Sequence, residues 1–238
     1  MLRWGGLKGG VENFGSPQNK ANKRCPPPLV GLFKFKFGYN KLHMNTIPEH
    51  PYRVQPSSVV ALLGERMQAA GDARLDVLDY GCGRGRNAHY LGFLGHSVLG
   101  VSDDFADVSS AAQDDFSSQA QYVVGDVRRP CFKKTFEAVL INEVLSYMPK
   151  AESNKVIRSA RSLTRPGGWN AVSGYLVSAD TVSETYKERC LGPNELLQSY
   201  ANMGWEIIDY HETVKPATYF GEREMINSLA SIIARKPK

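Results

Sequence analysis

Two hydrophobic periods alternate along residues 56–176. Apolar residues three and four positions apart predict helices, and short apolar runs between glycines or polar residues predict buried strands. The predicted helices are 56–71, 86–95, 105–118 and 151–164. The predicted strands are 75–80, 96–102, 121–126, 136–142 and 169–176. Strands that alternate with helices in this way favour a parallel sheet with helices on both faces.

The C-terminal residues continue with a different connection. A helix is predicted over 192–204, and strands are predicted over 205–214 and 225–236. Two successive strands indicate a hairpin, which would close the sheet with an antiparallel edge strand. The predicted fold class is α/β, a doubly wound Rossmann-like sheet that is mostly parallel and has an antiparallel C-terminal hairpin.

The sequence GCGRG (81–85) separates the first predicted strand from the next helix. Glycine gives up packing and helix propensity, so the backbone there must either turn sharply or approach a ligand. In an open α/β sheet, ligands bind outside the carboxyl ends of the strands, where a helix N-terminus offers free N–H groups. The loop therefore indicates a cofactor site, with a tight turn that binds nothing as the alternative.

The residues around this loop discriminate between two nucleotide-like cofactors. A dinucleotide loop needs G-x-G-x-x-G, but Arg86 stands where its third glycine would fall. The pattern present is D-x-G-x-G-x-G, which begins at Asp79. A carboxylate at this strand end repels a pyrophosphate and attracts an amino or sulfonium group. Asp79 therefore favours a cofactor like S-adenosylmethionine, and a nicotinamide-dependent oxidoreductase is the alternative.

Four segments in consistent order resemble the class I S-adenosylmethionine-dependent methyltransferases. They are VLDYGCGRGRN (77–87), QYVVGDV (121–127), FEAVLINEVLSYMP (136–149) and LTRPGGW (163–169). A narrower resemblance, to the tellurite-resistance (TehB-like) methyltransferases, rests on GCGRGRNAHYL, LGHSV, RPGGWNAV, GPNELLQSYANMGWEIIDYHETV and SLASIIARK. The resemblance implies a methyltransferase with S-adenosyl-L-methionine as cofactor and a small molecule as acceptor.

The resemblance also implies a set of cofactor-binding residues. Asp79 would hold the amino group of the cofactor's methionine, helped by the backbone around Gly81 and Gly83. The full implied set is Asp79, Gly81, Cys82, Gly83, Arg86, Asn87, Ser102, Asp103, Asp126, Val127, Asn142 and Val144.

The nucleoside part of the cofactor would be held after the second and third strands. The family has an acidic residue for the ribose at the end of the second strand, but Ser102 stands there and Asp103 follows. Either of them would bind the ribose. Asp126 would accept a hydrogen bond from the adenine amino group, and the Val127 N–H would donate to a ring nitrogen.

Catalysis of methyl transfer depends mainly on alignment and exclusion of water. Glu143 and Tyr147 are the catalytic candidates, and Tyr210 and His211 are further candidates for an acceptor that must lose a proton. Cys82 and His89 are expected to pack rather than react. Arg53 is expected at the surface, with a clamp on the methionine carboxylate as the alternative.

The resemblance implies a tellurite- or selenite-type oxyanion or a thiol as the acceptor. Such a soft acceptor would need no general base. The tellurite-resistance group implies a His-Arg pair within residues 211–224, where only Lys215 and Arg223 offer comparable charge. This departure puts the oxyanion in doubt. A cofactor-binding module that has lost catalysis is therefore the second alternative.

Charge divides the chain into two parts. Residues 1–43 hold eight Lys and Arg against Glu12, a net +7 in a chain of +5, so the remaining 195 residues sum to −2. Residues 1–43 are predicted to be a basic, disordered extension, and 44–238 a single methyltransferase domain. The charge and hydropathy predict neither a nucleic-acid partner nor a membrane one. Four cysteines without metal-ligand spacing predict free thiols, no metal site and a cytoplasmic protein.

Overall fold

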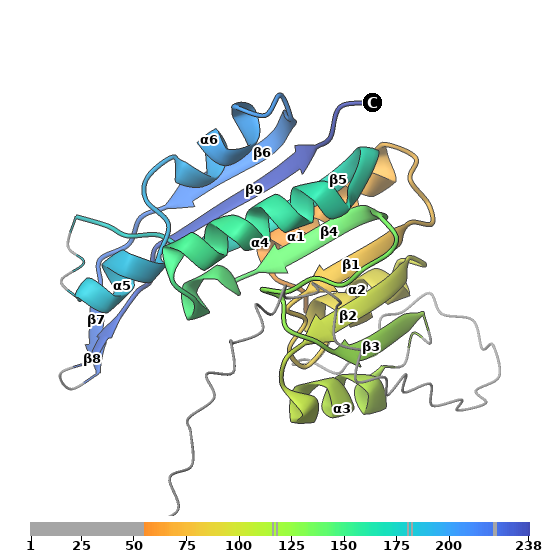
Figure 1. Cartoon of the computed structure of the whole chain (residues 1–238), viewed down its shortest axis with the longest axis horizontal. Coiled ribbons are helices and arrows are strands. Elements are labelled where there is room, and N and C mark those ends of the chain that lie inside the picture. The colour runs from red at the N-terminus through yellow and green to blue at the C-terminus, as the bar shows by residue number, and fades with distance from the viewer. Residues whose placement is uncertain (1–54, 116, 118, 180, 182, 221–222) are drawn as a thin grey trace, which may run out of the picture.

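A computed structural model describes residues 55–115, 117, 119–179, 181, 183–220 and 223–238. Its centre is a seven-stranded sheet in the order β3-β2-β1-β4-β5-β9-β6 (Figure 1). The first five strands in this order are parallel, and β9 pairs antiparallel with both β5 and β6. This arrangement confirms the predicted fold class.

Most of the elements follow one another as the periodicity predicts. The strands of the main sheet are β1 (Asp76–Tyr80), β2 (Ser97–Ser102), β3 (Ala120–Val124), β4 (Phe136–Asn142), β5 (Thr164–Tyr175), β6 (Glu206–Thr213) and β9 (Leu229–Arg235). The helices are α1 (Ser58–Ala69), α2 (Arg86–Phe93), α3 (Phe105–Asp114), α4 (Lys150–Leu163), α5 (Glu184–Arg189) and α6 (Glu195–Ala201). A 3-10 helix, η1 (Leu145–Tyr147), and a small hairpin, β7 (Thr218–Phe220) with β8 (Arg223–Met225), complete the structure.

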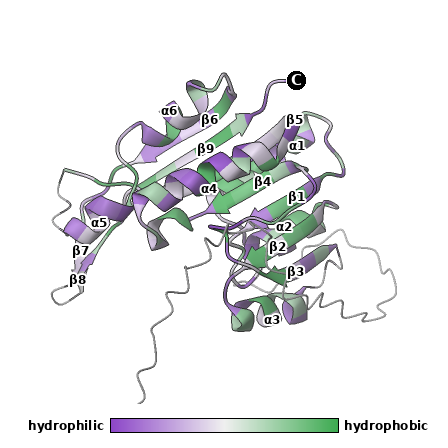
Figure 2. Cartoon of the chain, viewed as in Figure 1, coloured by the Kyte–Doolittle hydropathy of each residue, from purple (hydrophilic) through white to green (hydrophobic). Residues whose placement is uncertain are grey.

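Each face of the sheet buries its own hydrophobic cluster. Alternate residues of a strand point to opposite faces, so Val77 joins the cluster beneath α1, α2 and α3, and Leu78 joins the cluster beneath α4 and α6. The central strands are therefore largely apolar, and Figure 2 shows β4 as mostly hydrophobic. Tyr80, on the α4 face, donates a hydrogen bond from its hydroxyl to the Val127 carbonyl at 2.5 Å.

Two expectations about the C-terminal strands were wrong. The antiparallel strand is not at the edge: β9 lies between β5 and β6, and β6 forms the edge. In addition, β5 begins at Thr164 rather than at residue 169, and its first residues form an irregularity, where the pairing with β4 shifts between Phe136 and Ala138. Gly167 has a φ of +73°, which accommodates this irregularity.

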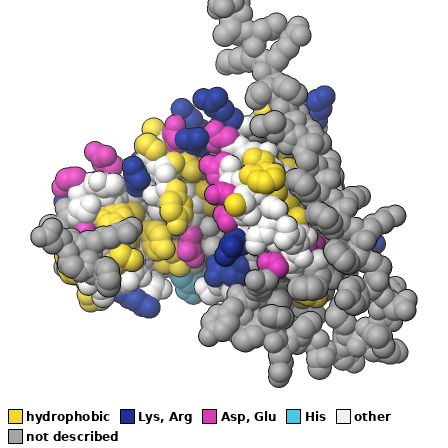
Figure 3. Space-filling model, turned by 90° about the horizontal axis from the view of Figure 1, so that it is seen from below, with side chains coloured by type: hydrophobic (Ala, Val, Ile, Leu, Met, Phe, Trp, Pro, Cys, Tyr) yellow, Lys and Arg dark blue, Asp and Glu magenta, His cyan; other side chains and the backbone are white. Residues whose placement is uncertain are grey.

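Several expectations concern composition rather than topology. Cys82 and Cys190 are buried free thiols, as expected, but Cys131 is disulfide-bonded, so the expectation of free thiols throughout was wrong. Residues 1–43 and Arg53 lie outside the described residues. No helix in the described ranges is long and apolar enough to cross a membrane. Acidic and basic side chains intermingle on the visible face in Figure 3.

The topology fixes where a ligand can bind. Strand β1 lies between β2 and β4, so the chain winds away from β1 in both directions. A crevice forms at such a switch in strand order, outside the carboxyl ends of the strands. Those ends belong to β1, β2 and β4, and the glycine loop follows the first of them.

Candidate cofactor site

The glycine loop needs glycine for conformation and for space. Gly81, Gly83 and Gly85 all have positive φ, at +98°, +50° and +82°. The N–H groups of Gly81 and Cys82 both donate to the Val101 carbonyl at 2.8 Å, which fixes the start of the loop. A Cβ added to Gly81 would lie 2.2 Å from Cγ2 of Val144, so the loop passes directly against the segment after β4.

A cavity of about 420 Å³ opens beside this loop. Ten of the twelve implied cofactor-binding residues line it, and they come from four separate segments of the chain. From the loop and α2 these are Gly81, Cys82, Gly83, Arg86 and Asn87. From the ends of β2, β3 and β4 they are Ser102, Asp103, Val127, Asn142 and Val144. The catalytic candidates Glu143 and Tyr147 also line the cavity, together with three residues that the sequence did not single out, Arg84, Arg128 and Met148.

Asp79 lies beneath the loop and does not line the cavity. Its side chain is buried, and neither carboxylate oxygen makes a hydrogen bond of normal geometry with any described residue. Burial raises the pKa of Asp79 to about 7, and the Ala88 N–H dipole and the Arg86 charge oppose this shift only in part. An unpartnered buried carboxylate of this kind fits a cofactor that carries a positive amino group near the loop.

Ser102 and Asp103 both reach the cavity after β2. Ser102 is buried, and its hydroxyl accepts a hydrogen bond from the Asp104 N–H at 3.3 Å. The Asp104 carboxylate caps α3, where it accepts from the N–H groups of Ala106 and Asp107 at 2.7 and 3.2 Å. Asp103 is therefore the carboxylate of this turn that faces the cavity.

Asp126 is the second implied residue that the structure keeps out of the cavity wall. Its carboxylate accepts from the backbone N–H of Arg128 at 2.9 Å and from Nε and Nη2 of the same arginine at 2.8 and 3.1 Å. These hydrogen bonds lower the pKa of Asp126. The expected acceptor for an adenine amino group is thus already engaged, and Arg128 lines the cavity in its place.

Glu143 has a strained backbone at the cavity. Its φ is +60°, a conformation that side chains other than glycine, asparagine and aspartate seldom adopt. The Glu143 N–H donates to the Ser173 carbonyl at 3.0 Å, and Asn142 Oδ1 accepts from the Ser173 hydroxyl at 2.9 Å. Strand β5 therefore holds this residue in place, and its position suits a functional role.

Replacing Glu143 with glycine is expected to raise the free energy of unfolding by about 1 kcal/mol, because the left-handed backbone costs about 1–2 kcal/mol for a residue with a Cβ. Methyl transfer is expected to fall if the carboxylate contacts the acceptor. Urea denaturation and initial rates measure the two effects. The Glu143→Asn variant is the control, because asparagine tolerates this backbone without supplying a carboxylate. A less stable glycine variant would contradict the assigned strain.

The further candidates for proton transfer lie elsewhere. Tyr147 is 78% exposed on η1 at the mouth of the cavity. Tyr210 and His211 are on β6, separated from β4 by β5 and β9, and neither lines the cavity. The Tyr210 hydroxyl donates to the Glu212 carboxylate, and His211 lies 3.9 Å from Asp209.

Cys82 and His89 are packed, as their sequence contexts predict. Burial raises the pKa of the Cys82 thiol well above its usual value, which disfavours a nucleophilic thiolate. His89 is buried, with Nε2 2.9 Å from the Ala111 carbonyl and its ring edge-on to Tyr122. Neither side chain is placed for catalysis.

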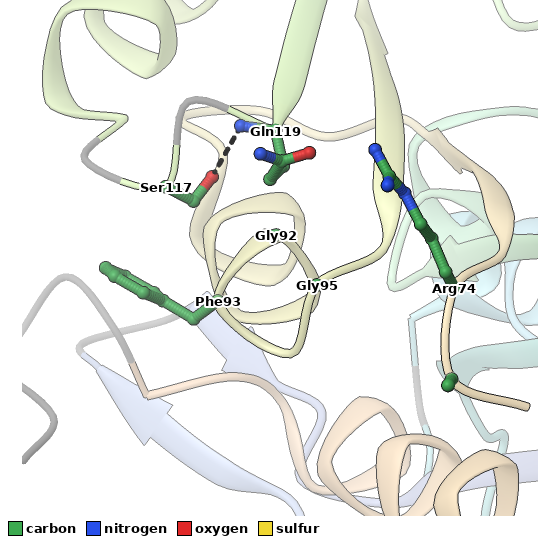
Figure 4. Close-up of a pocket in the computed structure, with 7 residues that line it drawn as sticks. Arg74, Gly92, Phe93, Gly95, Ser117 and Gln119 are labelled. Carbon is green, nitrogen blue, oxygen red and sulfur yellow. Dashed lines mark hydrogen bonds between the residues drawn. The ribbon is translucent and has the colours of Figure 1, made fainter. Parts of the chain in front are cut away.

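A second cavity, of about 370 Å³, lies at the opposite end of the strands (Figure 4). Arg74 precedes β1, Gly95 precedes β2 and Gln119 precedes β3, so its walls come from the amino ends of these strands. The Ser117 hydroxyl accepts from the Gln119 N–H at 3.2 Å across part of it. None of the implied site residues lies there.

Comparison with known proteins shows what this chain is similar to. Residues 77–168 match the family described as "Methyltransferase domain". The crystal structure of TehB from Haemophilus influenzae superposes with a TM-score of 0.59 at 20% identity, covering 73% of this chain and 62% of that one, which shows the shared fold. Residues 77–168 therefore match a methyltransferase domain, and the similarity to a probable S-adenosyl-L-methionine-dependent methyltransferase favours that cofactor over a nicotinamide.

Among methyltransferases, the chain is similar to the TehB group. The probable S-adenosyl-L-methionine-dependent methyltransferase TehB of Haemophilus influenzae is 24% identical over 142 residues, which are 58% of this chain and 48% of that protein. Hemagglutinin 1 of Eikenella corrodens is 29% identical over 171 residues, 67% of this chain and 54% of that protein. The chain spans about half the length of these curated relatives.

Proposed function

We propose that this protein transfers the methyl group of S-adenosylmethionine to a soft small-molecule acceptor, a tellurite- or selenite-type oxyanion or a thiol. The observation that carries the proposal is the cavity at the carboxyl end of β1. It gathers the loop, α2 and the ends of β2, β3 and β4 around a single space, with the unpartnered Asp79 carboxylate beneath it. The likeness to the TehB group supports an acceptor of this kind.

Different residues along the cavity would bind different parts of the cofactor. Asp79 and the loop at Gly81 would hold the amino acid end of the cofactor, and Ser102 or Asp103 the ribose. When bound, S-adenosylmethionine supplies an electrophilic methyl group, so the protein chiefly has to align an acceptor with it and exclude water. Val144, packed against Gly81, narrows the space next to the reacting centre.

The acceptor end of the cavity is the mouth beside Glu143 and Tyr147. A tellurium, selenium or thiolate lone pair attacks without losing a proton, so neither residue has to act as a general base for such an acceptor. Both would then orient the acceptor. An oxygen or nitrogen acceptor would instead require the Glu143 carboxylate as its base.

Calorimetric titration of the purified protein with S-adenosylhomocysteine, with NAD as a parallel control, tests the cofactor. We expect micromolar binding of the first and none of the second. Formation of S-adenosylhomocysteine with tellurite, selenite and thiols then tests the acceptor class. Binding without turnover across a broad acceptor screen would favour a cofactor-binding module that has lost catalysis.

A further inference from the structure

The end of the cavity that would hold the adenine base differs from the arrangement that the resemblance implied, in which Asp126 accepts a hydrogen bond from the adenine amino group. Val127 and Met148 are buried members of one hydrophobic cluster and give the cavity an apolar wall. Arg128, next to Val127 in the chain, also lines the cavity, with about half of its side chain exposed. A purine ring is flat and apolar on both faces, so this combination suits stacking better than a carboxylate would.

The Arg128 guanidinium is held in place by acidic side chains. Asp126 takes Nε and Nη2 in a two-point contact, at 2.8 and 3.1 Å, and Glu152 lies 3.8 Å from Nη1. These contacts occupy the edge of the planar group. What remains for a ligand is chiefly the flat face, and the two-point contact orients this face in advance.

We propose that Arg128 stacks on the adenine of the cofactor, and that Asp126 acts through it as a positioning residue rather than as the acceptor for the adenine amino group. This inference rests on the proposed function, because it concerns the same cofactor. It assigns base recognition to a cation–π contact against the apolar wall of Val127 and Met148.

Calorimetry on single variants tests the stacking role. Arg128→Ala is expected to weaken S-adenosylhomocysteine binding about 10- to 30-fold. Arg128→Lys is expected to weaken it nearly as much, because lysine keeps the charge and loses the planar face. Arg129→Ala is the matched control, because Arg129 is exposed and does not line the cavity, and it is expected to bind like the wild type.

Adenosine binding tests whether Arg128 acts on the nucleoside part of the cofactor. In NMR competition at millimolar concentrations, Arg128→Ala is expected to weaken adenosine by the same factor as S-adenosylhomocysteine. An unchanged adenosine affinity, or a lysine variant that matches the wild type, would overturn the stacking role. If the wild-type protein binds no S-adenosylhomocysteine, the proposed function itself is contradicted.

The Asp126→Ala variant separates positioning from direct contact, because alanine has no oxygen that could accept from the adenine amino group. Its titration compares S-adenosylhomocysteine with the analogue whose purine lacks the 6-amino group. If Asp126 only positions Arg128, loss of the amino group changes the affinity by the same factor in wild type and variant. A loss of tenfold or more in the wild type that disappears in Asp126→Ala would show direct acceptance by Asp126 and refute the proposal.

Discussion

Asp79→Asn is expected to weaken S-adenosylhomocysteine binding about 30- to 100-fold while the fold is retained. Asparagine has the same shape but no charge, so the cofactor's ammonium group would lose a charge-assisted interaction of about 2–3 kcal/mol. Calorimetric titration measures this loss, and circular dichroism checks the fold. Asp76→Asn is the matched control, because Asp76 lies at the other end of β1 and pairs with Lys134 and Arg165 at the surface. If the Asp79→Asn variant binds with wild-type affinity, Asp79 does not bind the cofactor.

The same carboxyl group is expected to make cofactor binding depend on pH. Its pKa of about 7 in the free protein means that roughly half of the molecules carry a proton there near neutrality. A positive ligand favours the ionised form, so affinity is expected to fall by up to about tenfold per pH unit below 7, with proton uptake by the protein as the cause. Titrations in buffers of different ionisation enthalpy would reveal about half a proton released on binding near pH 7, and a number that approaches one at lower pH. Asp79→Asn should release none.

Asp79 also links folding stability to pH in a defined direction. Its pKa rises from 3.8 in an unfolded chain to about 7 in the fold, so the folded protein keeps a proton that the unfolded chain has already lost. Its contribution is fully present below about pH 4 and disappears as the pH rises to about 7, a change on the order of 4 kcal/mol. The stability difference between Asp79→Asn and wild type should therefore grow in favour of the variant over this window.

The second large effect is expected at the glycine loop. Gly81→Ala should lower the free energy of unfolding by about 3 kcal/mol, the sum of a left-handed backbone and a collision with Val144. Gly83→Ala is the matched comparison. Its φ is also positive, but the nearest atom to its Cβ would be a carboxylate oxygen of Asp107 at 3.8 Å, so it should cost only about 1 kcal/mol.

Urea denaturation of the two glycine variants separates strain from close packing. Equal losses would show that the approach of Val144 does not constrain Gly81. A Gly81→Ala,Val144→Ala double variant should recover part of the loss, because truncation of the valine removes the atoms that the new Cβ meets. If the double variant recovers no stability, the loss in Gly81→Ala comes from the backbone conformation alone.

The periodicity of the chain was sufficient for the order and type of most elements. The strand over 136–142 was predicted with the bounds it has, because a continuous apolar run has to be buried on both faces of a parallel sheet. The small elements η1, α5, β7 and β8 were missed. They are three to six residues long, too short for a period to be recognised.

The candidate site was only partly accessible to sequence reasoning. The spacing D-x-G-x-G-x-G located the loop, because positive φ values demand glycine whatever surrounds them. Arg128 was missed, since DVRRP offers two adjacent arginines and nothing in the sequence says which of them turns back to Asp126. Tyr210 and His211 were considered because of their chemistry, and the position of β6 at the sheet edge removes them from the cavity.

The sequence by itself determined the α/β class, the glycine loop and the acidic residue that precedes it, because these depend on local periodicity and backbone conformation. The tertiary structure alone decided that β9 inserts between β5 and β6, that Asp79 is buried without a partner and that Asp126 is taken by Arg128. Each of these depends on which distant side chains meet and how much water they exclude, and a one-dimensional pattern carries no record of either.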